Sequence, residues 1–158
     1  MIKKLKKLIP IFSIFLTVGC GYKVINKVKL NNYSISNISS TGDRRVNYIL
    51  KNNLSLNSKN NSKNVLNLEL NSIKTKTVKE KNIQNQITKY EITVTVNAKL
   101  NFINNEKIYS INSSNNGDYV VSKNHSSTIT SEKSLIRNLV ENISNDIEDK
   151  ISAIVNDF

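Results

Sequence analysis

Residues 90–102 have the sequence YEITVTVNAKLNF, in which an apolar side chain occupies every even position from Tyr90 to Phe102. The odd positions between them carry glutamate, threonine, asparagine and lysine. Successive side chains of a β-strand point to opposite faces of its sheet. This alternation therefore predicts a strand that packs one face on a hydrophobic core and turns the other toward water or a polar partner.

Weaker β patterns lie on both sides of this strand. A strand is predicted over residues 65–78, where leucines alternate with polar residues until the apolar position shifts to Ile73, which indicates a bulge or a twist. The other predicted parts of the sheet are a strand over residues 33–39, a loop over 79–86, a turn at Asn104 and Asn105, and a strand over 107–111 that resumes at 119–121.

Two segments have helical periodicity. The first covers residues 43–56, with Asp43 as the predicted N-cap and apolar residues three or four positions apart. The second is a long C-terminal helix with Ser131 as the predicted N-cap and a wide apolar stripe from Leu135 to Ile154. Its opposite face is predicted to be solvated and carries Asn138, Glu141, Asn145, Glu148 and Asp149.

These elements follow one another in the order βαβββα. The sequence therefore predicts an α+β fold, with two helices packed on one face of a mainly antiparallel four-stranded sheet. We expect residues 33–158 to form a single domain, and the sheet face opposite the helices to present threonine, asparagine, lysine and glutamate.

The N-terminus has the pattern of an exported protein. Four lysines within the first seven residues precede a short apolar run that ends at Gly19 and Cys20, which predicts a signal peptide over residues 1–19 and a tether over residues 20–32. The end of the run resembles the lipobox of bacterial lipoproteins, which implies that Cys20 is acylated and becomes the mature N-terminus. The same resemblance favours the outer membrane, because residue 21 is glycine rather than aspartate.

The composition disfavours catalysis. The chain has one cysteine, one histidine and four scattered glycines, which leaves no cysteine-rich or paired-histidine metal motif and no phosphate-binding glycine loop. The histidine, His125, lies in a predicted loop, and no partner residues for a catalytic triad can be placed from the sequence. We therefore expect no enzyme activity, no catalytic residue, no metal and no cofactor.

The chain is strongly basic, with 23 lysines and arginines against 12 acidic residues and a net charge of +11. Nucleic-acid binding is one reading of such a charge. The few aromatic residues do not alternate with the basic ones as stacking platforms would, and an exported chain has little access to nucleic acid. We expect no nucleic-acid partner.

With these elements in place, the chain resembles the lipopolysaccharide-assembly lipoprotein family, LptE. The resemblance rests on LTVGCGY at residues 16–22, GDRRVNYIL at residues 42–50, the alternating strand 90–102 and the closing helix 135–154. It implies a non-enzymatic lipoprotein on the periplasmic face of the outer membrane. It also implies two partners: lipopolysaccharide, and the outer-membrane β-barrel that inserts it and that the protein plugs and helps to assemble.

Several lysines gather around residues 74–89, at the predicted loop between two strands. Because lipopolysaccharide carries phosphates, Lys79 and Lys81 are our candidates for phosphate contacts. A solvated basic face is the competing interpretation. A different function also stays open, namely that of another envelope accessory lipoprotein attached to a transporter or to cell-wall synthesis.

Overall fold

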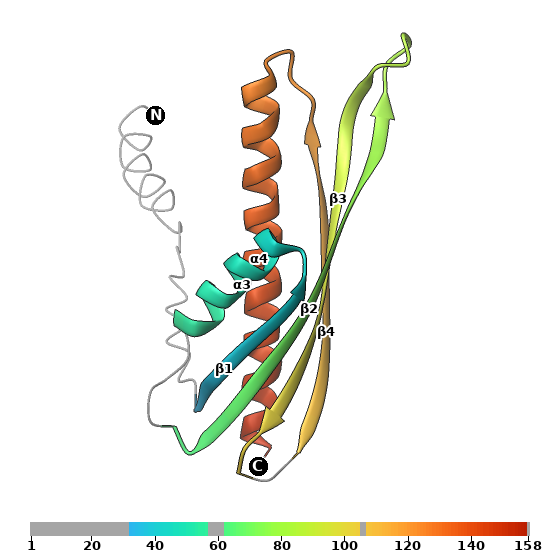
Figure 1. Ribbon diagram of the computed structural model, residues 1–158. Coiled ribbons are helices and arrows are strands. Elements are labelled where there is room, and N and C mark those ends of the chain that lie inside the picture. The colour runs from blue at the N-terminus through green and yellow to red at the C-terminus, as the bar shows by residue number, and fades with distance from the viewer. Residues whose placement is uncertain (1–31, 57–61, 105–106, 158) are drawn as a thin grey trace, which may run out of the picture.

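The computed structural model describes residues 32–56, 62–104 and 107–157 (Figure 1). The predicted signal peptide, Cys20 and all of the tether except Asn32 lie outside the described residues. The α+β fold and its βαβββα order are confirmed. In chain order the elements are β1 (Tyr33–Gly42), α3 (Arg44–Leu56), β2 (Asn64–Lys81), β3 (Ile87–Phe102), β4 (Ile108–Val120) and α4 (His125–Asn156).

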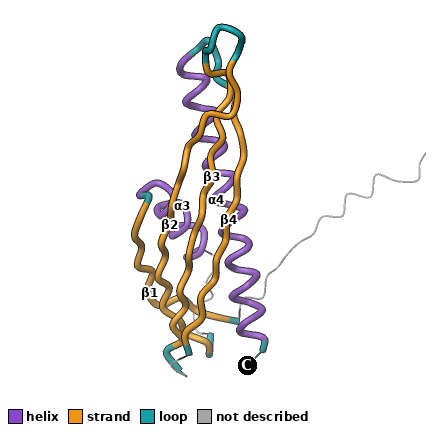
Figure 2. The backbone as a smooth tube through the Cα atoms, turned by 90° about the vertical axis from the view of Figure 1, so that its right-hand side faces the viewer, coloured by secondary structure: helices purple, strands orange, loops and turns teal. Residues whose placement is uncertain are grey.

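The strands form one sheet in the order β1-β2-β3-β4. The pairs β2–β3 and β3–β4 are antiparallel, and they are the longest pairings of the sheet. The pair β1–β2 is parallel, because α3 carries the chain back between these two strands. Figure 2 shows both helices on the same side of the sheet, as the sequence predicts.

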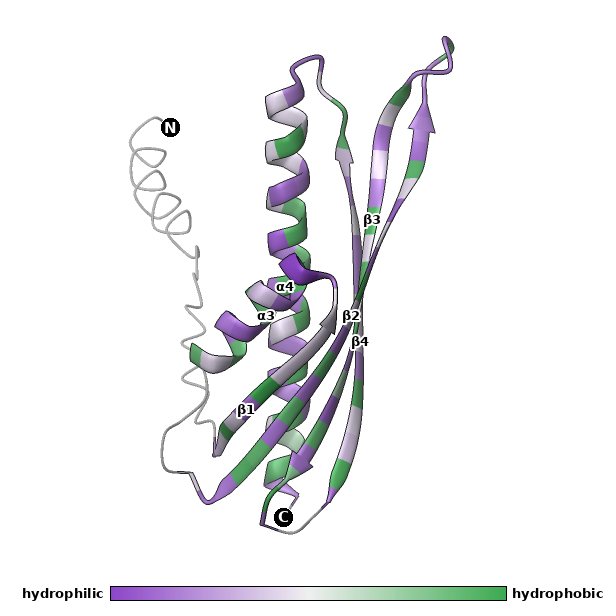
Figure 3. Ribbon diagram, in the orientation of Figure 1, coloured by the Kyte–Doolittle hydropathy of each residue, from purple (hydrophilic) through white to green (hydrophobic). Residues whose placement is uncertain are grey.

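One hydrophobic core joins all six elements. The alternation of residues 90–102 is confirmed, since the even positions from Ile92 to Phe102 are buried and the odd ones are not. Figure 3 shows this as bands of alternating hydropathy along β2 and β3. The other elements contribute Tyr33 from β1, Val46, Leu50 and Leu54 from α3, Leu66, Leu68 and Leu70 from β2, Ile111 and Tyr119 from β4, and Ile136, Leu139, Val140, Ile143, Ile147, Ile151 and Val155 from α4.

A tight corner connects β1 to α3. Gly42 ends β1 with φ at 97°, a conformation that side chains disfavour, and a Cβ there would lie 1.9 Å from the carbonyl oxygen of Ser72. The next residue, Asp43, accepts hydrogen bonds from the backbone N–H groups of Arg45 and Val46, both at 3.0 Å. The predicted N-cap is thus confirmed.

The strands are longer than the sequence predicts. Strand β2 continues through Lys81, so the first three residues of the expected loop 79–86 belong to β2, and the loop covers residues 82–86. No bulge occurs at Ile73: the pairing with β3 stays in register from Leu66 to Val78, Ser72 takes the buried position, and Ile73 points to the opposite face with 54% of its surface exposed. The irregularity lies instead between Val78 and Lys81.

Strand β4 is continuous, which contradicts the expected interruption between residues 111 and 119. Its helix-facing positions alternate in burial as in a regular strand, but they are filled by Ser113, Asn115 and Gly117 rather than by apolar residues. The small side chains let α4 lie close, since a Cβ at Gly117 would be 2.9 Å from Leu135 Cδ1.

Helix α4 starts earlier than predicted. Asn124, not Ser131, is its N-cap and accepts a 2.9 Å hydrogen bond from the N–H of Ser126. His125 is therefore the first residue of the helix and not part of a loop.

The prediction that Glu148 lies on a solvated face of α4 is wrong. Its side chain is only 1% exposed and lies on the side of α4 that faces α3. Among the described residues, neither helix combines the length and the apolar character needed to cross a bilayer.

Candidate functional site

The sheet face opposite the helices, which we call the outer face, is mainly polar, although Ile73 is exposed on it. Its cross-strand neighbours pair with one another: Asn112 donates to Asn97 at 2.6 Å, Thr95 and Ser114 share a 2.9 Å hydrogen bond, and Asn116 donates to Glu91 at 3.2 Å. The predicted polar face is thus present. The part of this face where all four strands lie side by side holds a hollow of about 570 Å³. It is lined mainly by polar side chains, which are Ser39, Thr41, Glu69, Asn71, Asn97, Lys99, Ser110 and Asn112.

Charges on the outer face are matched locally. Lys79 Nζ lies 2.7 Å from Asp118 Oδ1 and 3.7 Å from Glu91 Oε1, and these neighbours raise the pKa of Lys79, the hydrogen bond to Asp118 most of all. Lys99 lies 3.9 Å from Glu69 across the sheet. A partner of this face therefore meets hydrogen-bonding groups and paired ions rather than a single sign of charge.

The lysine cluster predicted from the sequence is brought together at one end of the sheet, but its members differ in their partners. Lys89 is paired with Glu80 at 2.7 Å, and Lys79 with its two carboxylates. Lys81 donates at 3.0 Å to the amide oxygen of Asn85, a neutral group. The two candidate phosphate contacts therefore differ. Among the described residues, a carboxylate contacts the ammonium of Lys79, and none contacts that of Lys81.

Two further lysines of this cluster face the helices and hold them in place. Lys74 lies 2.8 Å from Asp43, the cap of α3. Partial burial acts to raise the pKa of Asp43, but the hydrogen bonds from Lys74 and from the N–H groups of Val46 and Arg45, with the charge of Lys74, outweigh it. The pKa of Asp43 therefore falls below its ordinary 3.8.

Lys76 forms the corresponding contact with α4. Its Nζ lies 2.8 Å from Glu132 and 4.3 Å from the centre of the Tyr90 ring, while the hydroxyl of Tyr119 donates to the same carboxylate at 2.7 Å. Partial burial acts to raise the pKa of Glu132, but the hydrogen bonds from Lys76 and Tyr119 and the nearby lysine charges lower it below 4.5.

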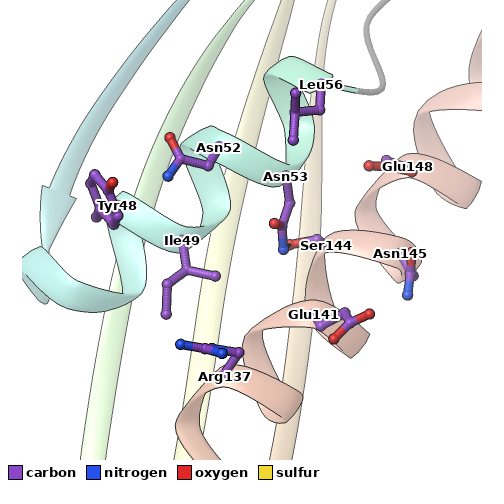
Figure 4. A pocket seen from close by; sticks show the side chains of 10 residues that line it. All are labelled: Tyr48, Ile49, Asn52, Asn53, Leu56, Arg137, Glu141, Ser144, Asn145 and Glu148. Carbon is purple, nitrogen blue, oxygen red and sulfur yellow. Dashed lines mark hydrogen bonds between the residues drawn. The ribbon is translucent and has the colours of Figure 1, made fainter. Parts of the chain in front are cut away.

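A second hollow lies between the two helices, and we call it the α3–α4 groove (Figure 4). It measures about 450 Å³, and Ile49 and Asn53 point into it from α3, where Asn53 donates to Ser144 of α4 at 3.2 Å. Tyr48 and Leu56 stand at its rim, 69% and 82% exposed. The remaining lining residues are Asn52, Arg137, Glu141, Asn145 and Glu148.

This groove was not predicted from the sequence. The helical periodicity of residues 46, 49, 50 and 54 indicated one apolar stripe; Val46, Leu50 and Leu54 are buried in the core, whereas Ile49 is partly buried and lines the groove. The missed signal is the pair of large apolar residues, Tyr48 and Leu56, eight positions apart on the otherwise polar side of the helix. Two helical turns place them on one face.

The described histidine and acidic side chains do not come together in a catalytic or metal site. His125 is exposed in the first turn of α4. Within residues 32–56, 62–104 and 107–157, no three histidine, cysteine or acidic side chains come together as metal ligands would. What these residues do form is a small α+β domain with two distinct surfaces, a polar sheet face and a groove between its helices.

Comparison with known proteins identifies the family. A family model described as "LptE: Lipopolysaccharide-assembly" matches residues 25–151. The chain belongs to this LptE family of lipopolysaccharide-assembly proteins, as its resemblance predicts. Membership of an assembly family agrees with the expectation that the protein is not an enzyme. A search of curated protein sequences finds no match.

Solved structures of bacterial lipoproteins share the fold. The rare lipoprotein B from Shewanella oneidensis is 13% identical with a TM-score of 0.55, over 76% of this chain and 97% of that one. A putative lipoprotein from Caulobacter crescentus is 12% identical with a TM-score of 0.54, over 75% and 90%. A lipoprotein B from Nitrosomonas europaea is 13% identical with a TM-score of 0.53, over 80% and 88%.

Proposed function

We propose that this protein is an outer-membrane lipoprotein that plugs the β-barrel inserting lipopolysaccharide into the outer leaflet, and that it assists the assembly of that barrel. The observation that carries the proposal is the match of the LptE lipopolysaccharide-assembly family over residues 25–151.

The outer face has the chemistry that a plug needs. The lumen of a membrane β-barrel is polar and wet, so a protein inside it must present hydrogen-bonding groups. The amides, hydroxyls and paired ions of the outer face do so across all four strands, and several of them line its hollow. This supports the outer face as the surface turned toward the barrel wall.

Cys20 is the proposed anchor. An acylated Cys20 would hold the domain on the periplasmic face of the outer membrane through residues 21–32, because two or more acyl chains bind a bilayer stably whereas one binds it marginally. Growth with labelled palmitate is the direct measurement. The label should appear on the native chain and be absent from a Cys20→Ser variant; an unlabelled native chain contradicts the anchor.

Co-purification tests the partnership. The full chain, carrying an affinity tag at its C-terminus, is isolated from envelope membranes in mild detergent, and bound proteins are identified by mass spectrometry. We expect one outer-membrane β-barrel in equal amount. Recovery of an inner-membrane transporter or of a cell-wall synthase instead contradicts the plug and favours the alternative, an accessory lipoprotein of another envelope system.

Lys79 and Lys81 are kept as proposed contacts to the phosphates of lipopolysaccharide. They lie on the same sheet end, and ammonium groups bind phosphate as point charges. The two lysines are not equivalent, since Lys79 would have to exchange two carboxylates for a phosphate. Unchanged lipopolysaccharide binding after reversal of both charges contradicts this proposal.

A further inference from the structure

The α3–α4 groove is an open surface with a mixed character. Its rim carries the exposed side chains of Tyr48 and Leu56, and its α4 wall carries Arg137 and Glu141, with Glu148 at the floor. Glu141 is exposed on this wall and offers a carboxylate to a basic side chain, whereas Glu148 is only 1% exposed. The groove therefore suits a segment that combines apolar side chains with positive charge.

The chain itself supplies such a segment. Residues 21–31, GYKVINKVKLN, contain three lysines, no acidic residue, and five large apolar or aromatic side chains. The family match begins at residue 25, so part of this segment belongs to the region that defines the family. Its composition complements the lining of the groove in both respects, charge and apolar surface.

The described chain also starts beside the groove. Tyr33, the first residue of β1, is fully buried, and its pKa is raised by burial and then by the negative charges of Glu148 and Asp149. Glu148 lines the groove. Residue 31 is two positions before Tyr33, so a segment that ends there is close enough in sequence to reach this end of the groove.

The length of the segment is sufficient for the length of the groove. The α4 wall runs from Arg137 to Glu148, which is about 17 Å along a helix at roughly 1.5 Å per residue. An extended chain covers this length with about five residues. The segment 21–31 is thus long enough to follow the whole groove and to leave several residues between the groove and Cys20.

We propose that residues 21–31 bind in the α3–α4 groove, with their apolar side chains against Tyr48 and Leu56 and their lysines toward Glu141. Binding shortens the part of the tether that extends from the domain, and so limits how far the domain can move from an anchor at Cys20. The binding is intramolecular and requires neither a barrel partner nor lipopolysaccharide, so it can fail or hold independently of the proposed function.

Photo-crosslinking of the full chain identifies the occupant. A benzophenone amino acid replaces Leu56 at the groove rim, and in a matched control it replaces Ile73 on the outer face, which is also exposed. The Leu56 probe should join to peptides from residues 21–31, and the Ile73 probe should not. A Leu56 product that contains another protein or a second copy of the chain, or that lacks a tether peptide, overturns the proposal.

Charge provides a second test. Chymotrypsin can cut after Tyr22 and Leu30, and cleavage follows the fraction of molecules in which the segment is released. Glu141→Lys should speed this cleavage about threefold, the scale on which exposed ion pairs act. Asn138→Lys adds a lysine on the same helix outside the groove lining and should leave the rate unchanged. Equal rates for the native chain and Glu141→Lys overturn the proposal.

Discussion

Lys76 of β2 and Glu132 of α4 are joined by an ion pair of 2.8 Å, although 56 residues separate them in the chain. The ammonium also lies 4.3 Å from the centre of the Tyr90 ring and 5.3 Å from that of Tyr119. A charge that faces an aromatic ring and a carboxylate at once is stabilised by both. This contact fixes the N-terminal half of α4 against the far end of the sheet.

Replacing the lysine tests this contact. Lys76→Met keeps the length of the side chain but removes the charge, and should lower the free energy of unfolding by about 1 kcal/mol, because the pair is partly exposed and screened by solvent. Urea denaturation followed by circular dichroism measures the change. Lys81→Met, which removes an ammonium bonded to a neutral amide, is the control and should cost less than about 0.5 kcal/mol. Equal losses in the two variants would contradict the role of Lys76.

Acid should weaken both attachments of the helices. The folded-state pKa values of Asp43 and Glu132 lie below their ordinary values of 3.8 and 4.5. Their stabilisation is therefore complete above those ordinary values and is lost as the pH falls through the lower, folded-state values. Urea midpoints measured from about pH 7 down to about pH 3 should fall in the acidic part of this range. In Glu132→Gln the fall should be shallower; the same fall in both proteins would exclude Glu132 as a source.

The most accurate prediction came from the strongest alternation of apolar and polar residues. Residues 90–102 lie in β3, which pairs with β2 on one edge and β4 on the other, and their apolar positions are buried without exception from Ile92 onward. Asp43 was identifiable as a cap because only a short polar side chain can accept from the first turn of a helix. In these places local chemistry and packing agree.

The errors occur where packing overrides local pattern. Strand β4 turns Ser113 and Gly117 toward α4, because a closely packed helix needs small neighbours, and a polar sequence then forms a regular strand. Glu148 is buried because it faces α3, which the periodicity of α4 alone does not reveal. The pairing of each lysine with its carboxylate likewise depends on the register of distant strands, so Lys79 and Lys81 could not be distinguished from the sequence.

Gly42 should be the least replaceable glycine of the described chain. Its φ of 97° is strained for any other residue, and the backbone oxygen of Ser72 occupies the place of a Cβ. Gly42→Ala should therefore lower the free energy of unfolding by more than about 2 kcal/mol. Gly117→Ala is the matched control: its Cβ would be too close only to the end of the Leu135 side chain, which can move, and in ordinary contact with Leu139, so the loss should be about 1 kcal/mol. A smaller loss for Gly42→Ala than for Gly117→Ala, in urea denaturation, would contradict this account of the β1–α3 corner.

Lys81 should matter more than Lys79 for lipopolysaccharide binding, if the two lysines contact its phosphates as proposed. Lys79 already forms ion pairs with Asp118 and Glu91. A phosphate could pair with Lys79 only by displacing these two carboxylates. Lys81 is held by the amide of Asn85 alone among the described residues, and exchanging a neutral acceptor for a phosphate is favourable. Lys81→Gln should thus weaken binding about three- to fivefold and Lys79→Gln less than about twofold, measured with the purified chain and lipopolysaccharide at low and high salt. Each variant removes one positive charge, so they control for net charge, and equal losses would mean that the overall basic character of the chain, rather than Lys81, attracts the ligand.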